Sequence, residues 1–281
     1  MKFIIIFFSF SLNTYARMLP ESHITAPLTV KNAKLTEARF NILIDQVVNS
    51  YRDVFHEYGM HKLMVNRQWE SEKINASAAR GSNNTFLMNI YGGLGRYEPI
   101  TDDAFMLILC HEVGHLIGGA PTMKPQNNIS SEGQADYFST AKCFRKIAQK
   151  YPEKIPPKAD IHPLAREKCR DTFSKDQTMK AEICLRSSLA QESLARTMAM
   201  LSENEVTPKL DTPDPEERTF IIFNGYPSPQ CRIDTLFSAS LCHRDENELL
   251  DLKKYNKGVC SVPNGDIAGV RPRCWYVPRI D

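Results

Sequence analysis

Apolar residues recur at intervals of three and four along much of this chain, which is the period of an amphipathic α-helix packed on a core. The pattern predicts helices over residues 35–55, 179–201 and 233–241. Residues 62–69 and 85–91 alternate apolar and polar positions instead, which predicts β-strands. Residues 105–110 are apolar on every side, so the helix expected there should be buried. The sequence therefore predicts an α+β fold that is mainly helical with a small sheet.

The buried helix has clear start and stop signals. Thr101, followed by two aspartates, is a favourable N-cap with acidic residues in the first turn. Gly118 and Gly119 end the helix. After a polar loop, Ser130 or Ser131 is expected to cap a second helix. The sequence thus predicts a helix, a turn and another helix.

The stretch His111-Glu112-Val113-Gly114-His115 lies at the end of the first of these helices. His111 and His115 are four residues apart, so both imidazoles lie on one helix face and can reach one metal ion. Glu112 lies beside them and can act on a water at that metal. The alternative is an ordinary buried helix that carries two histidines. Gly114 costs about 1 kcal/mol relative to alanine in a helix, which a close approach of the second helix would explain.

A catalytic zinc ion needs three protein ligands and one open position. The next carboxylate is Glu132, at the start of the second predicted helix, and we expect it to be the third ligand. Asp136 lies one turn further on and can accept the other ring N–H of His111 or His115, which fixes its tautomer. The alternative interpretation is that both acidic residues only favour the helix dipole. Their distance from the histidine motif favours the metal site.

The H-E-x-x-H motif at 111–115, followed by E-x-x-A-D at 132–136, resembles the gluzincin metallopeptidases. Within them, the chain is similar to the CAAX prenyl-protein endopeptidase family and its small soluble relatives, the minigluzincins. The resemblance covers roughly residues 75–240. It implies a zincin-like fold in which Zn²⁺ serves the hydrolysis of a peptide or protein substrate. In that family the strand before the metal helix is the sheet edge that pairs with extended substrate, which implies this role for residues 85–91.

A second segment carries the same resemblance. The family has His-Pro, with Arg-Ile following so that proline and arginine are five residues apart. Here Pro227, Arg232 and Ile233 keep that spacing, and Tyr226 replaces the histidine. The resemblance implies that the Tyr226 hydroxyl donates to the oxyanion of the tetrahedral intermediate, with Arg232 in the same site. The alternative is that the two residues only fix the loop.

Residues 1–16 are typical of a secretory signal peptide, with Lys2, an apolar stretch over 3–12 and a small-residue cleavage site ending at Ala16. The apolar stretch is too short to span a membrane, and no later stretch approaches the necessary length. We therefore expect an exported protein, periplasmic or secreted, whose mature chain has no membrane span. Removing Lys2 from 35 basic residues, against 33 acidic ones, leaves a net charge of +1. This balance indicates neither a nucleic-acid partner nor an anionic membrane.

The chain contains eight cysteines, namely Cys110, Cys143, Cys169, Cys184, Cys231, Cys242, Cys260 and Cys274. An even number in an exported chain predicts disulfides, whose pairing the sequence leaves open. For Cys110, a buried thiol is the alternative. Residues 246–281 contain the last two cysteines and several prolines with little periodicity, which predicts a disulfide-held tail on a catalytic domain over 17–245.

Three functions follow from these patterns. The first is an exported zinc metalloendopeptidase. The second is a zinc amidase that acts on a cell-wall peptide or another small amide through the same metal chemistry. The third is a cysteine-rich binding protein without catalysis. Glu112 argues against the third, because a structural metal site needs no general base.

Overall fold

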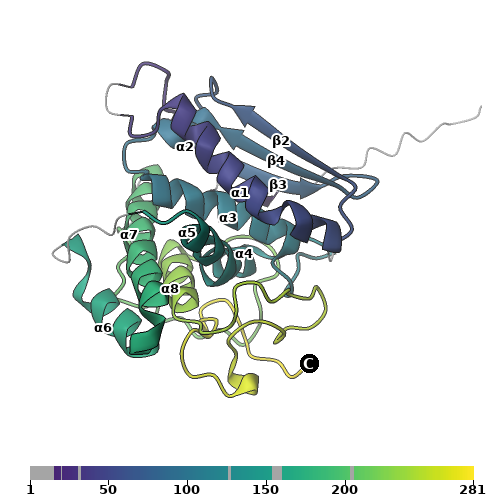
Figure 1. Cartoon of the computed structure of the whole chain (residues 1–281), viewed down its shortest axis with the longest axis vertical. Coiled ribbons are helices and arrows are strands. Elements are labelled where there is room, and N and C mark those ends of the chain that lie inside the picture. Colours follow the sequence, from purple (N-terminus) through teal and green to yellow (C-terminus); the bar gives the residue numbers. More distant parts are fainter. Residues whose placement is uncertain (1–15, 20, 31–32, 126–127, 154–159, 203–205) are drawn as a thin grey trace, which may run out of the picture.

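The computed structural model describes residues 16–19, 21–30, 33–125, 128–153, 160–202 and 206–281. The predicted signal peptide lies outside these residues except for Ala16. The described part of the chain has an α+β fold with a small mixed sheet, a group of helices and a C-terminal region of coil (Figure 1).

The α-helices are α1 (Glu37–Glu57), α2 (Gly92–Arg96), α3 (Asp102–Ile117), α4 (Glu132–Phe138), α5 (Arg145–Lys150), α6 (Pro163–Thr172), α7 (Thr178–Leu201) and α8 (Pro229–Ser240). A π-helical turn, η1 (Ser139–Phe144), joins α4 to α5 without a break. Two 3₁₀ turns are η3 (Lys175–Gln177) and η4 (Val262–Asn264). The helices predicted around α1, α3, α7 and α8 are confirmed, with small shifts at their ends, whereas α6 was not predicted.

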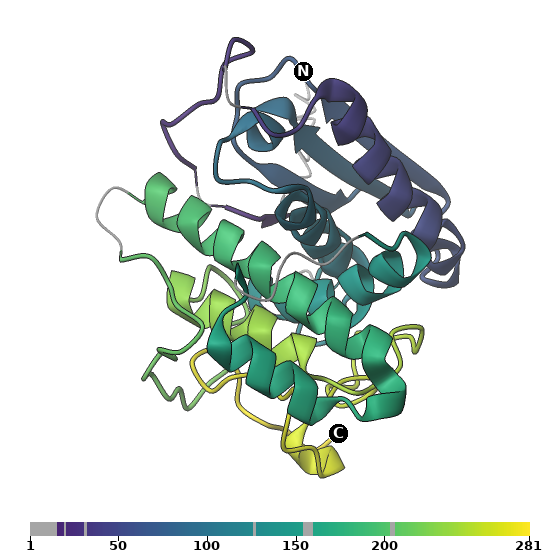
Figure 2. The same ribbon diagram turned by 60° about the vertical axis from the view of Figure 1, so that its left-hand side comes forward.

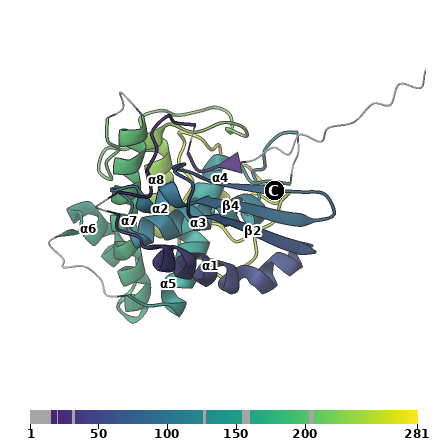
Figure 3. The same cartoon turned by 90° about the horizontal axis from the view of Figure 1, so that it is seen from above.

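The strands are β1 (Ala16–Arg17), β2 (Lys62–Gln68), β3 (Ala76–Arg80) and β4 (Thr85–Tyr91). They form one sheet in the order β1-β3-β4-β2. β2 runs parallel to β4, whereas β3 is antiparallel to β4 and β1 is antiparallel to β3. Alternate residues of β4, namely Phe86, Met88 and Ile90, are buried against the helices on one face of the sheet. α1 and α3 lie on this face (Figure 3).

The prediction that residues 85–91 form the edge of the sheet is wrong. β4 pairs with β2 on one side and with β3 on the other, so neither of its edges is free. The strand on the side of α3 is β3, which reads Ala-Ser-Ala-Ala-Arg and is buried over its first four residues. Because small residues on both faces remove the alternation of apolar and polar side chains, the pattern did not reveal this strand. Among the described residues, the outer edge of β3 pairs with the two residues of β1, and the N–H of Met18 donates to Ala76.

α3 is the central helix of the molecule. It contacts β3 and α1 on one side and α4, η1 and α7 on the other, with α7 and α8 lying away from the sheet (Figure 2). Every residue from Ala104 to Ile117 is buried, as its apolar sequence predicted. Thr101 is the N-cap and accepts a hydrogen bond from the backbone of Ala104, and Gly118 is the C-cap. Ser131 is the N-cap residue of α4.

α3 and α4 approach each other closely at Gly114. A Cβ atom on Gly114 would lie 2.9 Å from both Cα and O of Ala135, which are backbone atoms that cannot move aside locally. A side chain on Gly133 would likewise overlap the ring of the buried Trp275 from the C-terminal region. Glycine at these two positions therefore allows α4 to lie between α3 and the C-terminal residues.

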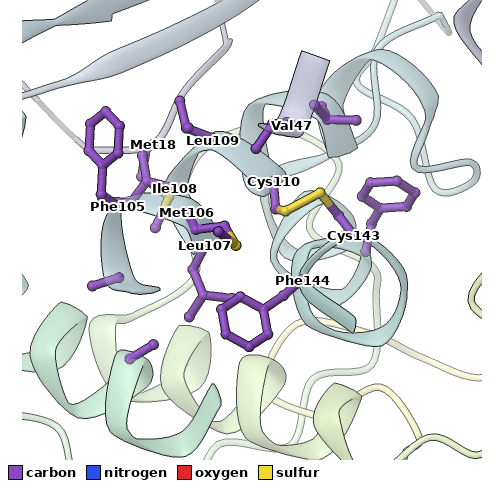
Figure 4. Close-up of a cluster of buried hydrophobic side chains, with 14 of the residues drawn as sticks. Met18, Val47, Phe105, Met106, Leu107, Ile108, Leu109, Cys110, Cys143 and Phe144 are labelled. Carbon is purple, nitrogen blue, oxygen red and sulfur yellow. A yellow bond between two sulfur atoms is a disulfide. The ribbon is translucent and has the colours of Figure 1, made fainter. Parts of the chain in front are cut away.

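All eight cysteines are paired. Cys110–Cys143 joins α3 to η1 within the core (Figure 4), and Cys169–Cys184 joins α6 to α7. Cys231–Cys274 and Cys242–Cys260 join residues 246–281 to α8 and to the segment after it. The predicted disulfides are thus present, and the alternative of a free thiol at Cys110 is wrong.

We predict that Gly114→Ala destabilises the protein, although alanine normally favours a helix. The added methyl group would push α4 away from α3, and overpacking of this kind costs about 1–3 kcal/mol. Urea unfolding followed by circular dichroism measures the change. Gly81→Ala is the matched control, because its Cβ would meet no atom closer than 3.5 Å. A Gly114→Ala variant as stable as Gly81→Ala would contradict the close contact.

Candidate metal centre

The C-terminal half of α3 and the first residue of α4 bring together three side chains that can bind a metal. His111 and His115 lie one turn apart on α3, and Glu132 opens α4. All three are buried. One ligand atom from each lies within 4.8 Å of the other two. The structure therefore places the three predicted ligands around one point.

The distances between these atoms match a tetrahedral zinc site. His111 Nε2 lies 2.9 Å from His115 Nε2 and 3.2 Å from Glu132 Oε2, and His115 Nε2 lies 3.6 Å from Glu132 Oε1. Ligand atoms about 2.0–2.1 Å from zinc are about 3.3 Å apart at the tetrahedral angle. The three separations, which involve both oxygens of Glu132, lie on either side of this value and are compatible with one shared ion.

The outer nitrogens of the two rings show which atoms carry hydrogen. His115 Nδ1 lies 2.8 Å from the backbone oxygen of Ser130, which can only accept, so this nitrogen is the donor. His111 Nδ1 lies 2.8 Å from Asp136 Oδ1, which is an ion-pair distance, although the angle is outside hydrogen-bond geometry. His115 Nε2 is therefore an acceptor when its ring is neutral, and it faces His111 Nε2 and a carboxylate. A positive charge between these atoms, carried by a proton on His111 or by a metal ion, suits this arrangement.

The charges around the ligands also favour a cation. Burial alone would lower the pKa of His111, but Asp136 and Glu132 together raise it to about 9. Burial would raise the pKa of Glu132, but the two histidines hold it well below its usual range. The buried carboxylates thus stabilise positive charge between the ligand atoms.

Glu112 lies beside this point and is itself fully buried. Neither of its carboxylate oxygens completes a hydrogen bond with the part of the chain that the structure describes. Burial raises its pKa to about 7, although His111, His115 and the backbone N–H of Met18 lower it. A carboxyl group with a pKa near neutrality and free lone pairs can both take and release a proton.

Arg232, on α8, binds the same carboxylate as His111, that of Asp136. Its Nε and Nη2 atoms donate to the two oxygens of Asp136 at 2.7 and 2.8 Å, a bidentate ion pair that is fully buried. Burial would raise the pKa of Asp136, but Arg232 and His111 lower it, so Asp136 is an anion and orients the His111 ring. The structure therefore places Arg232 next to the predicted ligands, where it binds Asp136.

Tyr226 lies just before α8 and is partly exposed, with 39% of its surface accessible. Its hydroxyl donates to the backbone oxygens of Arg17 at 3.0 Å and Leu19 at 3.4 Å. Burial raises its pKa, and the nearby carboxylates of Glu132 and Glu112 contribute, so the hydroxyl keeps its proton. The hydroxyl is thus a donor near the metal centre, and it points at the N-terminal segment.

Sequence reasoning missed two residues at this site, Met18 and Asn75. The backbone oxygen of Met18 accepts a hydrogen bond from Arg232 Nη1 at 2.5 Å. Asn75 precedes β3 and pairs with the backbone of Leu19. No spacing or motif signals either role, because each depends on where the N-terminal segment lies in the fold.

No protein family model, curated protein or solved structure matches this chain. Two further groups of metal-binding residue types occur in the described residues, but each includes disulfide-bonded cysteines, Cys231 and Cys274 in one and Cys260 in the other. Among the described helices, none has the length and apolar character that crossing a membrane requires.

We predict that the protein binds Zn²⁺ tightly and that the bound ion raises its thermal stability, since an ion that binds only the folded state stabilises it. Glu132→Gln should weaken zinc binding most, because it removes a ligand charge. Asp136→Asn should weaken it by about 10–100-fold, because the His111 ring loses its anionic partner. Competition with a chromophoric chelator measures both affinities on the folded protein.

Asp53→Asn, an exposed substitution on α1, is the control for the loss of one acidic charge. A Glu132→Gln variant that binds zinc as tightly as Asp53→Asn would show that the three residues do not form the site.

Proposed function

We propose that this protein is an exported zinc metalloendopeptidase of the gluzincin type, with a zincin-like fold. The observation that carries the proposal is the convergence of three buried acceptors, from His111, His115 and Glu132, beside a carboxyl group, Glu112, that lacks a hydrogen-bond partner among the described residues. A structural metal site needs no general base. Because burying an unpaired carboxyl group costs free energy, the buried Glu112 favours a catalytic site.

When bound by these three residues, Zn²⁺ supplies Lewis acidity at the position where they converge. Glu112 takes the proton of the attacking water and passes it to the leaving amine. Asp136 holds the His111 ring in one tautomer, and Arg232 holds Asp136. The Tyr226 hydroxyl donates to the carbonyl oxygen of the bound peptide, where negative charge develops in the transition state.

A pocket lined by Leu19, Tyr226 and Arg232, here called the cleft, lies beside the candidate metal centre. We infer that an extended peptide is its substrate. The outer edge of β3 pairs with an extended segment of the chain itself, and backbone pairing of this kind accepts many side-chain sequences. This observation favours a peptidase over an amidase that acts on a small amide, because such a substrate does not need a strand edge.

The disulfides and the N-terminal sequence support export. Four disulfides are typical of proteins that fold in an oxidising compartment, which the periplasm and the extracellular space provide. A signal peptide over residues 1–16 is consistent with this location. The near-neutral charge balance supports a peptide or protein partner rather than a nucleic acid.

We predict that Glu112→Gln keeps zinc but loses peptide hydrolysis by about 10²–10⁴-fold, because the amide cannot take the proton of water. The measurement is the cleavage of a diverse peptide library by zinc-loaded protein, with products identified by mass spectrometry and zinc content measured in parallel. Glu192→Gln on α7 serves as the control for an acid-to-amide change elsewhere. Equal cleavage by wild type and Glu112→Gln would refute the assignment of the base.

A further inference from the structure

The N-terminal segment of the described chain lies in the cleft beside the metal centre. Ala16 and Arg17 form β1 and pair antiparallel with β3, Ala16 opposite Ala78 and Arg17 opposite Ser77. Met18 and Leu19 continue this extended path and are almost completely buried, at 1% and 2% exposure. Met18 belongs to the core cluster that includes the apolar residues of α3 (Figure 4). The chain thus occupies the strand edge that an extended peptide would use.

One peptide bond of this segment, Arg17–Met18, lies beside the groups to which the proposed mechanism gives catalytic roles. Its carbonyl oxygen, on Arg17, accepts the hydrogen bond from the Tyr226 hydroxyl at 3.0 Å. Its nitrogen, on Met18, lies near the carboxyl group of Glu112, although its N–H donates to the oxygen of Ala76. In the proposed mechanism the Tyr226 hydroxyl stabilises the carbonyl oxygen of the scissile bond, and Glu112 protonates the leaving nitrogen. These are the two positions that the atoms of Arg17–Met18 occupy.

The register of the segment is fixed on the C-terminal side of this bond. The backbone oxygen of Met18 accepts from Arg232 Nη1 at 2.5 Å. The backbone of Leu19 forms two hydrogen bonds with the side chain of Asn75, N–H to Oδ1 at 3.2 Å and C=O to Nδ2 at 2.8 Å. The N–H of Met18 donates to the oxygen of Ala76 at the start of β3, with 3.4 Å between nitrogen and oxygen. These contacts hold the Arg17–Met18 bond in place, since a slip of one residue would break all of them.

We propose that Arg17–Met18 is the first peptide bond that this site hydrolyses, so that the chain processes its own N-terminus. The proposal rests on the function proposed above. The oxygen of one water molecule adds to the carbonyl carbon of Arg17, the C–N bond to Met18 breaks, and Glu112 transfers the proton of that water to the departing nitrogen. The products are a carboxylate on Arg17 and an amino group on Met18.

Residues 18 and 19 limit the access of other substrates to the edge of β3. Met18 and Leu19 stay in the cleft after the cut, because their side chains are buried and Asn75 holds the backbone. If a signal peptide is removed after Ala16, the released product is a single arginine. A peptide from solution has to displace residues 18 and 19 before it can pair with the edge of β3, so the processed enzyme acts on such peptides more slowly than on itself.

The first experiment determines the N-terminus of the full-length protein. Wild type and Glu112→Gln are expressed with export, purified in a chelator, and then given Zn²⁺, and intact mass is followed with time. We expect wild type to lose Arg17 and begin at Met18, whereas Glu112→Gln keeps Arg17. The rate should not depend on protein concentration, because the bond lies in the cleft of its own chain. Tyr226→Phe should slow the step by about 10²-fold or more, through loss of the hydroxyl donor.

A wild-type chain that keeps Arg17 in the presence of zinc overturns the proposal. The same sample is given the peptide library, and the result separates the two claims. Cleavage of added peptides by a chain with an intact Arg17–Met18 bond leaves the peptidase function standing and removes only the self-processing. Absence of both reactions in zinc-loaded protein removes the peptidase function as well.

A second experiment tests the position of the segment without any metal or turnover. Hydrogen exchange is measured on metal-free Glu112→Gln protein, in which Arg17–Met18 stays intact. The amides of Met18 and Leu19 should exchange slowly, and Tyr226→Phe in the same background should speed their exchange by about tenfold, because the hydroxyl no longer holds the carbonyls of Arg17 and Leu19. Exchange of both amides at the rate of an unstructured peptide would place the segment outside the cleft and overturn the proposal.

Discussion

The close contact between α3 and α4 at Gly114 and Ala135 is the constraint on which the candidate site depends. It places Glu132 at the distance from His111 and His115 that a metal ion spans, although α4 begins fifteen residues after α3 ends by sequence. The Cys110–Cys143 bridge joins α3 to η1, which follows α4 directly. With Trp275 packed on Gly133, α4 is held on two faces, which leaves the ligand positions little freedom.

Buried side chains of opposite charge alternate beside this contact. Arg232 binds Asp136, Asp136 binds His111, and His111 faces Glu132, all in the interior. Each buried charge is compensated by the next one, whereas removing one member would leave an uncompensated charge in a region of low dielectric. The series ends at the point where the two Nε2 atoms and Glu132 converge. A metal ion bound at that point would replace the proton of His111 as the positive charge between Asp136 and Glu132, so the fold and the proposed metal site depend on the same interactions.

The pattern of apolar and polar residues predicted an element correctly where its burial and its ends depend on residues nearby in the sequence. The run of apolar residues before His111 predicted the buried helix, and Thr101 and Gly118 predicted its ends, because capping and burial depend on neighbours in sequence. β3 was missed because its small residues hide the alternation. β4 was wrongly placed at the edge of the sheet because the resemblance gave that position to the strand before the metal helix. Strand order depends on partners distant in sequence, which periodicity does not report.

The sequence by itself predicted the candidate ligands and the candidate base, since the four-residue spacing of His111 and His115 puts both on one face of any α-helix and Glu112 lies beside them. It also determined that the cysteines pair, though not with which partners. Only the tertiary structure decided that Arg232 holds Asp136 and that Tyr226 faces the backbone of Arg17. Those contacts join residues about a hundred to two hundred positions apart, and packing alone brings them together.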